Sequence, residues 1–336
     1  MAYESTRTNF FSDAEVELTV NVTAPEVLAG RVTWQLTALH RTIARGDALV
    51  KLEPDNPTSV NLRFRMPHVK EGVVHNTLLT VSFTQAGQRR AATTVETEWW
   101  VFAPDPFADR TQWLEQLELQ LFDPGGATAK LFRSAGIPFA ELRSVGELKT
   151  ADSGLIIVAE GVKRSEMAET LVSLAAAGRN VLWFAPTVCE LQIPGSEEFD
   201  EKLPKELAFR GSDRIEQLDK RLDPNAWSDP ELAKSVGFQV VSRRGLTNVE
   251  VADAETGWSW VTANYGDPDA QFILCGLGLI DAWDASPTPR YLLLRLLEQL
   301  DPQREANSEN VNTDSRNADE TQSPSTTEEP APKGHR

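Results

Sequence analysis

The chain has 336 residues, of which 40% are hydrophobic and 25% are charged, so it is long enough for two globular domains and a tail. Its net charge of −17 excludes a nucleic-acid partner, because a phosphate backbone attracts basic surfaces. No apolar run reaches about 18 residues, so no transmembrane segment is expected.

Residues 1–13 form a polar N-terminal extension. They lack the basic start and apolar h-region of a secretory signal, so none is expected in the chain as written. Residues 14–103 alternate between apolar and polar side chains, beginning with Val16, Leu18, Val20 and Val22. A period of two, interrupted by turn residues, is typical of strands with one face in water. The pattern predicts an immunoglobulin-like β-sandwich.

The pattern changes after a predicted linker at 104–112. Strands become continuously apolar, at 154–159 and 181–185, and helices are expected at 127–135 and 165–177. Shorter strands are expected at 117–122 and 139–142. This β-α-β-α-β order predicts a parallel sheet covered by helices on both faces over residues 113–301, in a flavodoxin-like three-layer α/β domain.

The second half of this domain is less regular. Residues 187–237 are rich in proline and charge and carry few clear elements. Later elements are four strands and a closing helix, expected at 238–242, 248–252, 258–263, 271–275 and 286–300. Residues 302–336 are nearly devoid of apolar side chains and predict a disordered acidic tail.

Histidine is found only outside the α/β domain. His40, His68 and His75 lie in the sandwich, and His335 lies in the tail. A cysteine or serine nucleophile needs a base, normally histidine, within hydrogen-bond reach. A Cys-His or Ser-His pair inside the α/β domain is therefore excluded, and only the sandwich could donate the base. The three sandwich histidines are expected to be exposed or at strand ends.

The two cysteines, Cys189 and Cys275, make neither a disulfide framework nor a metal site. They are predicted to be buried free thiols. Cys189 follows a buried strand, as the reactive residue of a nucleophile elbow does. However, no glycine flanks it and it comes four residues after that strand. We expect no catalytic residue and no metal ligand.

Phosphate-binding motifs are incomplete. The turn at 123–126 (DPGG) precedes an expected helix and Gly276-Leu277-Gly278 follows a strand, but neither completes G-x-G-x-x-G or a P-loop. Both are predicted as plain strand-to-helix turns, and no cofactor is expected.

Carboxylates at the expected strand ends are the best site candidates. Ligands of open α/β sheets bind outside the carboxyl ends of the strands, where the sequence places Asp123, Glu160, Asp281 and Asp284. Trp283 is the least core-like of the nine tryptophans. The predicted ligand-binding residues are therefore Asp123, Glu160, Asp281 and Trp283. The alternative is that these carboxylates cap helices and solvated loops.

Three phrases resemble the start of the class I glutamine amidotransferase-like fold: LFDPGGATAKLFRSAGIPF, SGLIIVAEGV and GRNVLWFAP. In that family the last of these strands ends in a nucleophile elbow, and Ala185 and Pro186 stand about where its cysteine would be. The later His-x-Glu pair of the family has no counterpart. The resemblance implies that the fold is kept and the activity lost, which makes the domain a pseudoenzyme.

Other phrases resemble the C-terminal region of family 2 β-galactosidase-like glycoside hydrolases, which are bacterial proteins. They are TRTNFFSDAEVELTVNV, VTWQL, FRMPHV and VFAPDPF in the sandwich and FILCGLGLIDAWDASPTPRYLLLRLL at the close of the α/β domain. The catalytic barrel of that family would need about 250 residues, for which this chain has no room. We therefore expect a fragment, periplasmic or secreted only if it belongs to a larger glycosidase.

Three functions follow as hypotheses. The first is a non-catalytic accessory or scaffold region that braces a catalytic barrel domain, contributes to a second-subunit interface or contacts a glycan; it predicts an exposed apolar face on the sandwich. The second is a stand-alone ligand- or protein-binding module that uses the carboxyl edge of the α/β sheet; it predicts a well-formed pocket. The third is an active amidotransferase or hydrolase, against which the missing histidine and elbow argue.

Overall fold

The structure is a computed structural model. It describes residues 2–3, 7–162, 165–185, 189–193, 204–211, 213–227, 238–242, 247–249, 260–266 and 269–301. The chain divides into two compact units, Met1–Leu296 and Leu297–Arg336, and all four sheets lie in the first. The tail at 302–336, predicted to be disordered, lies outside the described residues.

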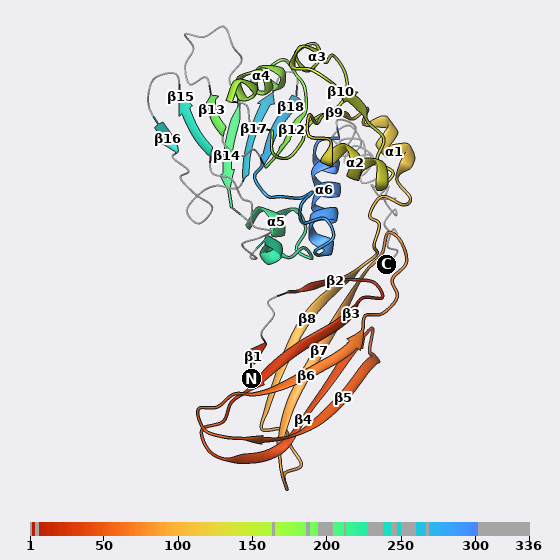
Figure 1. The fold of residues 1–336 in the computed structure, drawn as a ribbon, viewed down its shortest axis with the longest axis vertical. Coiled ribbons are helices and arrows are strands. Elements are labelled where there is room, and N and C mark those ends of the chain that lie inside the picture. The colour runs from red at the N-terminus through yellow and green to blue at the C-terminus, as the bar shows by residue number, and fades with distance from the viewer. Residues whose placement is uncertain are drawn as a thin grey trace, which may run out of the picture. The chain divides into compact units, whose positions relative to one another are not determined.

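Two sheets form from the alternating N-terminal strands (Figure 1). One contains, in spatial order, β1 (Ala2–Tyr3), β3 (Glu15–Val22) and β6 (Thr58–Arg65). The other contains β2 (Asn9–Phe11), β8 (Thr93–Phe102), β7 (Val74–Gln85), β4 (Leu28–Ala38) and β5 (Arg41–Leu52). All neighbours pair antiparallel except β2 and β8, which run parallel.

The two sheets share one hydrophobic core, so the predicted period of two is confirmed. Side chains of β3 and β6 alternate between buried and exposed, and Leu18 lies opposite Leu62 in the register. From the other sheet, Val32, Leu79 and Val81 are fully buried in the same cluster. Polar side chains of β3 and β6 face outward, which is the arrangement expected of antiparallel strands with one wet face.

Glycines admit two aromatic rings to this core. A Cβ atom on Gly46 would lie 2.7 Å from the indole of Trp34, and one on Gly30 would lie 2.5 Å from the ring of Phe83. Trp34 packs on Phe64 with ring centroids 5.4 Å apart. Both glycines are therefore required by close approach of a side chain from the neighbouring strand.

A seven-stranded mixed sheet follows. Its spatial order is β10 (Ala140–Leu142), β9 (Gln120–Phe122), β11 (Ile156–Val158), β12 (Val181–Phe184), β18 (Asp269–Cys275), β17 (Trp260–Gly266) and β14 (Glu206–Arg210). The first five strands are parallel, and β11 and β12 are fully buried, as predicted. The predicted parallel pairing is confirmed for these strands, and β17 and β14, whose direction the sequence did not specify, add antiparallel strands at one edge.

Helices α2 (Ala127–Ser134), α3 (Val145–Lys149) and α4 (Ser165–Ala176) connect the parallel strands from β9 to β12. Helix α1 (Thr111–Gln116) precedes β9, and helix α6 (Pro287–Gln299) follows β18. The predicted helices at 127–135, 165–177 and 286–300 are confirmed as α2, α4 and α6. Helix α4 packs against β12 and β18. The sheets and helices together are consistent with a multidomain protein that has a β part and an α/β part.

Residues 187–237, predicted to hold few elements, carry several. They include β13 (Cys189–Ile193), α5 (Asp213–Leu218), a 3₁₀ turn at Pro224–Trp227 and the edge strand β14. A fourth sheet, of three strands, joins β13 to β15 (Phe238–Ser242) and β16 (Thr247–Val249). The elements within 187–237 are short and carry charged residues, so their hydrophobic period is weak and the sequence does not reveal them. By contrast, β15 matches the strand predicted at 238–242, and β16 overlaps the one predicted at 248–252.

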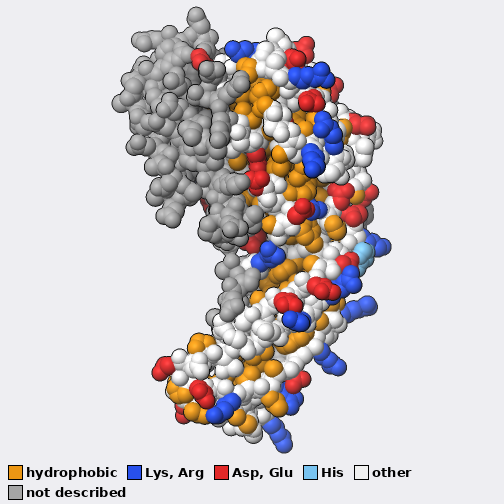
Figure 2. All heavy atoms as spheres, in the orientation of Figure 1, with side chains coloured by type: hydrophobic (Ala, Val, Ile, Leu, Met, Phe, Trp, Pro, Cys, Tyr) orange, Lys and Arg blue, Asp and Glu red, His pale blue; other side chains and the backbone are white. Residues whose placement is uncertain are grey.

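No helix in the described part of the chain is long and apolar enough to cross a membrane. On the face drawn in Figure 2, acidic and basic side chains are interspersed with apolar ones. The negative net charge is thus not concentrated in one field on that face.

Gly154 and Gly161 form a matched pair that separates the cost of a steric clash from the cost of left-handed backbone. Both have positive φ, +71° and +72°, but a Cβ on Gly154 would lie 2.1 Å from the carbonyl oxygen of Glu118, whereas one on Gly161 would meet no described atom within 4 Å. Gly161→Ala should lower the free energy of unfolding by about 1–2 kcal/mol, from left-handed backbone alone. Gly154→Ala should lower it by about 1–3 kcal/mol more. Urea unfolding measures both, and equal losses would contradict the clash.

Candidate functional site

Asp123 lies directly after β9, at the carboxyl edge of the parallel strands. One carboxylate oxygen accepts hydrogen bonds from the backbone N–H groups of Gly125 and Gly126, at 3.1 and 2.8 Å. The other accepts one from Ala129 at 2.8 Å, inside the first turn of α2. The side chain therefore closes the turn and satisfies helix amides that would otherwise be unpaired. This is the capping role that the sequence left open as the alternative.

Glu160 follows β11 at the same sheet edge and anchors a distant loop. Its Oε1 accepts from the backbone N–H of Ile280 at 2.7 Å, and its Oε2 accepts from that of Asp281 at 3.3 Å. The structure thus brings two predicted site residues, Glu160 and Asp281, together. Asp281 contributes its backbone to this contact.

The environment of Glu160 raises the pKa of its carboxyl to near neutral pH. Burial raises its pKa from 4.5 to about 7, against the lowering effect of the Ile280 hydrogen bond, and the Asp281 charge raises it further. A carboxyl with this pKa can exchange a proton near pH 7. Both of its oxygens are nevertheless bound to backbone amides of the 279–281 loop, so its present geometry is that of a loop anchor.

The position that resembles a nucleophile elbow is occupied by alanine. Ala185 follows β12, is 6% exposed and has a φ of +26°, a conformation unusual for a residue other than glycine. Its backbone N–H donates to the carbonyl of Cys275. Burial raises the pKa of the Cys275 thiol to about 12, so this cysteine is an inert buried thiol, as predicted. Pro186 and the Cys189 side chain lie outside the described residues.

Trp283 is buried, with 8% of its surface exposed, although the sequence places it in a loop. It lines a pocket of about 570 Å³. The other lining residues come from the segment after β8, from α2 and from the start of α6, namely Pro104, Asp105, Pro106, Ala127, Lys130, Leu131, Ser134, Ala135, Asp284 and Arg290. The ammonium of Lys130 makes no hydrogen bond or ion pair within the part of the chain that the structure describes.

Arg290, on α6, organises one wall of this pocket. Its guanidinium donates to the carbonyl oxygens of Trp283, at 2.9 Å, and Pro104, at 2.7 Å, and to the carboxylate of Asp284. It also lies 4.6 Å from the ring centroid of Phe11 and 5.5 Å from that of Trp283. We call Phe11, Pro104, Trp283, Asp284 and Arg290 the Arg290 junction. Together they connect the segment after β8, the 279–286 loop and α6.

Further hydrogen bonds surround the same helix. The Asn9 amide donates to Thr288 Oγ1 at 2.6 Å, and the Tyr291 hydroxyl donates to the carbonyl of Ala103 at 3.1 Å. Asp223 accepts from the backbone of Thr8 at 3.1 Å, while its own N–H donates to Thr288 at 2.9 Å. Several of these groups are buried, so they are protected from competition by water.

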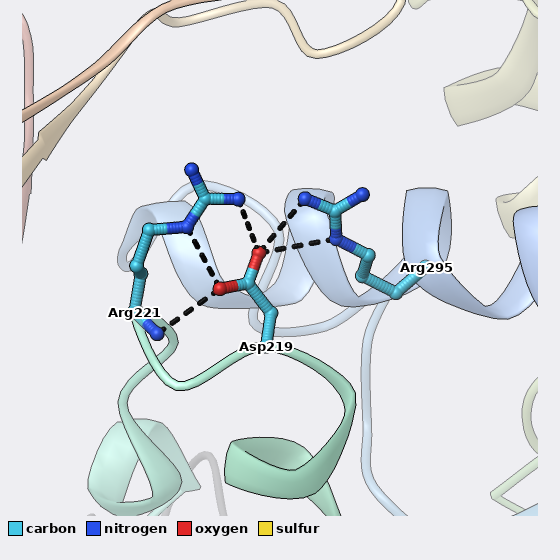
Figure 3. A network of polar contacts seen from close by, with 3 residues as sticks. All are labelled: Asp219, Arg221 and Arg295. Atoms are coloured by element: carbon cyan, nitrogen blue, oxygen red, sulfur yellow. Dashed lines mark hydrogen bonds and ion pairs between the residues drawn. The ribbon is translucent and has the colours of Figure 1, made fainter. Parts of the chain in front are cut away.

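A second charged cluster holds the turn after α5 to α6. Asp219 lies between Arg221 and Arg295, which approach its carboxylate from opposite sides (Figure 3). Arg221 donates to both oxygens, at 2.8 and 2.6 Å, and Arg295 donates twice to Oδ2, at 3.1 and 2.8 Å. Burial alone would raise the pKa of Asp219, but the hydrogen bonds from Arg221 and Arg295 lower it to about 2. The carboxylate therefore stays ionised.

The sequence did not point to Arg290 or Arg295 as residues that organise the structure. A signal existed for Arg295, which interrupts a run of leucines in α6, because a charge within an apolar stripe is seldom buried unless it is paired. Arg290 follows two prolines and carries no comparable signal.

The sandwich histidines lie in turns or near strand ends, as expected. His40 occupies a turn with φ +65°, and His75 lies in the first residues of β7. His68 is exposed, and its Nδ1 lies 2.7 Å from the Asp13 carboxylate. Among the described residues, no three His, Cys, Asp or Glu side chains gather in a way that could hold a metal ion.

No protein-family model matches the chain, and no curated protein matches its sequence. In structure it is similar to a glycoside hydrolase family 2 member from Bacteroides cellulosilyticus, at 12% identity and TM-score 0.25 over 75% of this chain and 35% of that one. It is also similar to a Bacteroides uniformis beta-glucuronidase, at 9% identity and TM-score 0.25 over 58% of this chain and 23% of that one. A third similar structure is a Paenibacillus sp. cycloisomaltooligosaccharide glucanotransferase complexed with cycloisomaltoheptaose, at 12% identity and TM-score 0.26 over 55% of this chain and 27% of that one.

The chain thus spans between 23% and 35% of these three proteins. Because all three TM-scores are below 0.5, the likenesses support no assignment of family or activity.

Glu160 should make stability depend on pH. Its folded pKa of about 7 lies above the ordinary value of 4.5, so ionisation disfavours the folded state. The free energy of unfolding should fall as the pH rises from 4.5 to about 7, by an amount on the order of 3 kcal/mol, and then level off. Glu160→Gln should remove this component, and Glu98→Gln, at an exposed side chain, should not. Urea unfolding between pH 4.5 and pH 8 measures this; parallel wild-type and Glu160→Gln curves would refute it.

Arg290→Lys should loosen the Arg290 junction. Lysine keeps the positive charge but cannot reach three acceptors with a planar fork, so the free energy of unfolding should fall by roughly 2–4 kcal/mol. Amide exchange should accelerate at residues 101–107 and 279–286. Arg45→Lys, at an exposed side chain of β5, is the matched control and should change neither. If Arg290→Lys behaves like the control, the guanidinium does not organise the junction.

Proposed function

We propose that the chain is a non-catalytic accessory region of a glycoside hydrolase-like protein, which braces a catalytic barrel domain. The observation that carries this proposal is the Arg290 junction. The Arg290 side chain is only 20% exposed, and its guanidinium binds acceptors from the segment after β8 and from the 279–286 loop. Such a network supports a rigid bracket, because the bond to Pro104 joins segments 186 residues apart while the bonds to Trp283 and Asp284 fix the loop next to α6.

Residues at the carboxyl edge of the parallel strands support the non-catalytic part of this proposal. Asp123 and Glu160, the two carboxylates there, are bound to backbone amides of the protein itself. Ala185, where the amidotransferase-like resemblance places a nucleophile, has only a methyl group. An active amidotransferase or hydrolase is the least supported function; glutaminase turnover that disappears in Cys189→Ala would revive it.

Exposed apolar side chains in the sandwich point to where a catalytic domain would pack. Three of the five large exposed hydrophobic residues in the described chain lie on the β4–β5 hairpin: Leu39, Ile43 and Leu49. Strand β5 is also the edge of its sheet and therefore has unpaired backbone groups. An accessory role predicts that a docked domain covers this hairpin.

The alternative is a stand-alone ligand- or protein-binding module. The pocket of about 570 Å³ favours it, because buried Trp283 offers an aromatic wall and Lys130 offers an ammonium that pairs with no other described residue. That volume lies within the range of about 300–1,000 Å³ typical of small-molecule sites. The glycan contact that the accessory role would allow could also use this pocket.

The intact mass of the native protein in its own cells tests the proposal. An accessory region should be found in a product much heavier than 37.2 kDa, with peptides upstream of Met1 or a stably bound second chain. Amides of the β4–β5 hairpin should exchange more slowly in that product than in the isolated chain, which should hydrolyse no aryl glycoside. A stable monomer of 37.2 kDa would exclude the accessory role and leave the binding module.

A further inference from the structure

Strand β5 leaves one edge of the larger sandwich sheet without a neighbouring strand. It is the last strand in the spatial order of that sheet, and in the described structure it forms a ladder with β4 alone (Figure 1). It contains 12 residues, whereas strands in globular proteins average about five or six. A long open edge offers unpaired backbone groups to a strand of another chain. This edge is therefore a candidate interaction surface.

The register shows which backbone groups of β5 point away from β4. The carbonyl of Ala29 on β4 accepts from the N–H of Ala86, which lies just after β7, so the backbone of Ala29 points toward β7. Lys51 lies opposite Ala29 and therefore forms a non-hydrogen-bonded pair with it, with its own N–H and carbonyl at the free edge. The Thr58 hydroxyl on β6 supports this direction, because it donates to the Lys51 carbonyl at 3.3 Å.

The same direction recurs at every second residue of β5, because the pairing with β4 has no register shift between residues 44 and 52. The outward backbone groups are those of Arg45, Asp47 and Leu49. The side chains of these residues are exposed as well, to 77% for Leu49. Each of them thus offers both its backbone and its side chain to a partner strand.

The hydrophobic core of the sandwich is also incompletely covered at this edge. In the described sandwich, the hydrophobic residues that pack against the core while remaining partly exposed come from β4 and β5: Leu28, Trp34, Ala44, Ala48 and Val50. A further strand beside β5 would bring its own inward side chains next to them and remove more of their apolar surface from water. A partner that fits is therefore a strand with the same alternation of inward apolar and outward polar residues.

The outward side chains of β5 are complementary to the same strand in reverse. Antiparallel pairing of two copies about Gly46 places Arg45 opposite the partner's Asp47, and it does so twice. It also brings Ile43 next to the partner's Leu49, and both are exposed hydrophobic residues. Opposite charges and apolar pairs across neighbouring strands stabilise a sheet. We propose that two copies of this chain pair edge to edge through β5, in a symmetric dimer with Gly46 on its two-fold axis.

Charge selects this register over its neighbours. Only odd-numbered residues between 45 and 51 point outward, so the neighbouring symmetric registers that keep the hydrogen bonds are centred on Arg45 or on Asp47. The first would set two arginines opposite each other and the second two aspartates, and like charges directly opposite are destabilising. Asp47 already lies 3.5 Å from Arg31 of its own chain, but both side chains are more than half exposed, and a carboxylate has two oxygens to share.

The ends of β5 limit the length of the paired segment. Beyond Ala44 the pairing with β4 shifts register, so the regular edge stops there. At the other end, the Lys51 carbonyl already accepts from Thr58, and the Lys51 ammonium lies 3.3 Å from Glu53. The paired segment is therefore short, and the dimer should dissociate on dilution.

Pairing through β5 uses the edge of the sheet. The outward side chains of the β4–β5 hairpin stay on one face of the joined sheet, where a docked catalytic domain can still pack. The inference therefore goes beyond the accessory role proposed above and does not rest on it.

Sedimentation equilibrium of the full chain tests the proposal. A salt concentration of about 0.15 M screens the long-range repulsion between two chains of net charge −17. The mass should rise with concentration from 37.2 kDa toward twice that value. Asp47→Arg sets arginine opposite arginine in both charge pairs, so it should weaken dimerisation by about tenfold or more.

Glu17→Arg is the matched control. It makes the same change of charge and removes an exposed ion pair, with Arg63, just as Asp47→Arg removes the one with Arg31, but it lies in the other sandwich sheet. It should dimerise like the wild type. Combining Arg45→Asp with Asp47→Arg restores opposite charges across the axis, so this double variant should dimerise within about threefold of the wild type.

Residue-resolved amide exchange by NMR identifies the surface that pairs. The amides of Arg45 and Asp47 should exchange slowly in the dimer and faster on dilution, whereas that of Gly46, which points toward β4, should exchange slowly throughout. The proposal is overturned if the mass stays at 37.2 kDa up to about 0.5 mM. It is equally overturned if Asp47→Arg dimerises as tightly as Glu17→Arg, or if the double variant, shown to be folded by circular dichroism, stays monomeric.

Discussion

The Arg290 guanidinium is the constraint on which the arrangement around α6 depends. A guanidinium presents five N–H donors in a fixed plane, so it can bind acceptors that come from different directions only if all of them are already in place. Here those acceptors are two backbone carbonyls and a carboxylate, and aromatic rings lie near the guanidinium. Tyr291, the next residue, extends the network to Ala103. Hydrogen bonding of this partly buried cation thus fixes the segment after β8 and the 279–286 loop together.

The carboxylates of Asp219 and Glu160 show how hydrogen-bond partners decide the effect of burial on a pKa. Burial alone raises the pKa of both Asp219 and Glu160, because it disfavours the charged form. Two arginines reverse this for Asp219, whose pKa is about 2, while backbone amides offset it only in part for Glu160, whose pKa is about 7. Asp219 is therefore a permanent ionic contact between the α5 turn and α6. Glu160 is a loop anchor whose charge changes near neutral pH.

The elements that the sequence predicts are those whose burial is a local pattern. The alternation in β3 and the apolar runs of β11 and β12 are visible within a few residues, because each strand's neighbours bury it in one repeating way. The strand-end positions of Asp123 and Glu160 followed from the same reasoning. The role of Glu160 did not, because it binds Ile280, 120 residues away. The same is true of Asn9, which binds Thr288, 279 residues away. Which backbone amide folds back onto a carboxylate depends on the whole chain, as does the antiparallel addition of β17 and β14.

A strand-end carboxylate marks a ligand site only when its hydrogen bonds are not already made by the protein. Asp123 and Glu160 fail this test, because backbone amides occupy their oxygens. The carboxyl edge of the α/β sheet therefore holds the fold together through these two side chains: Asp123 closes the turn before α2, and Glu160 fixes the 279–281 loop.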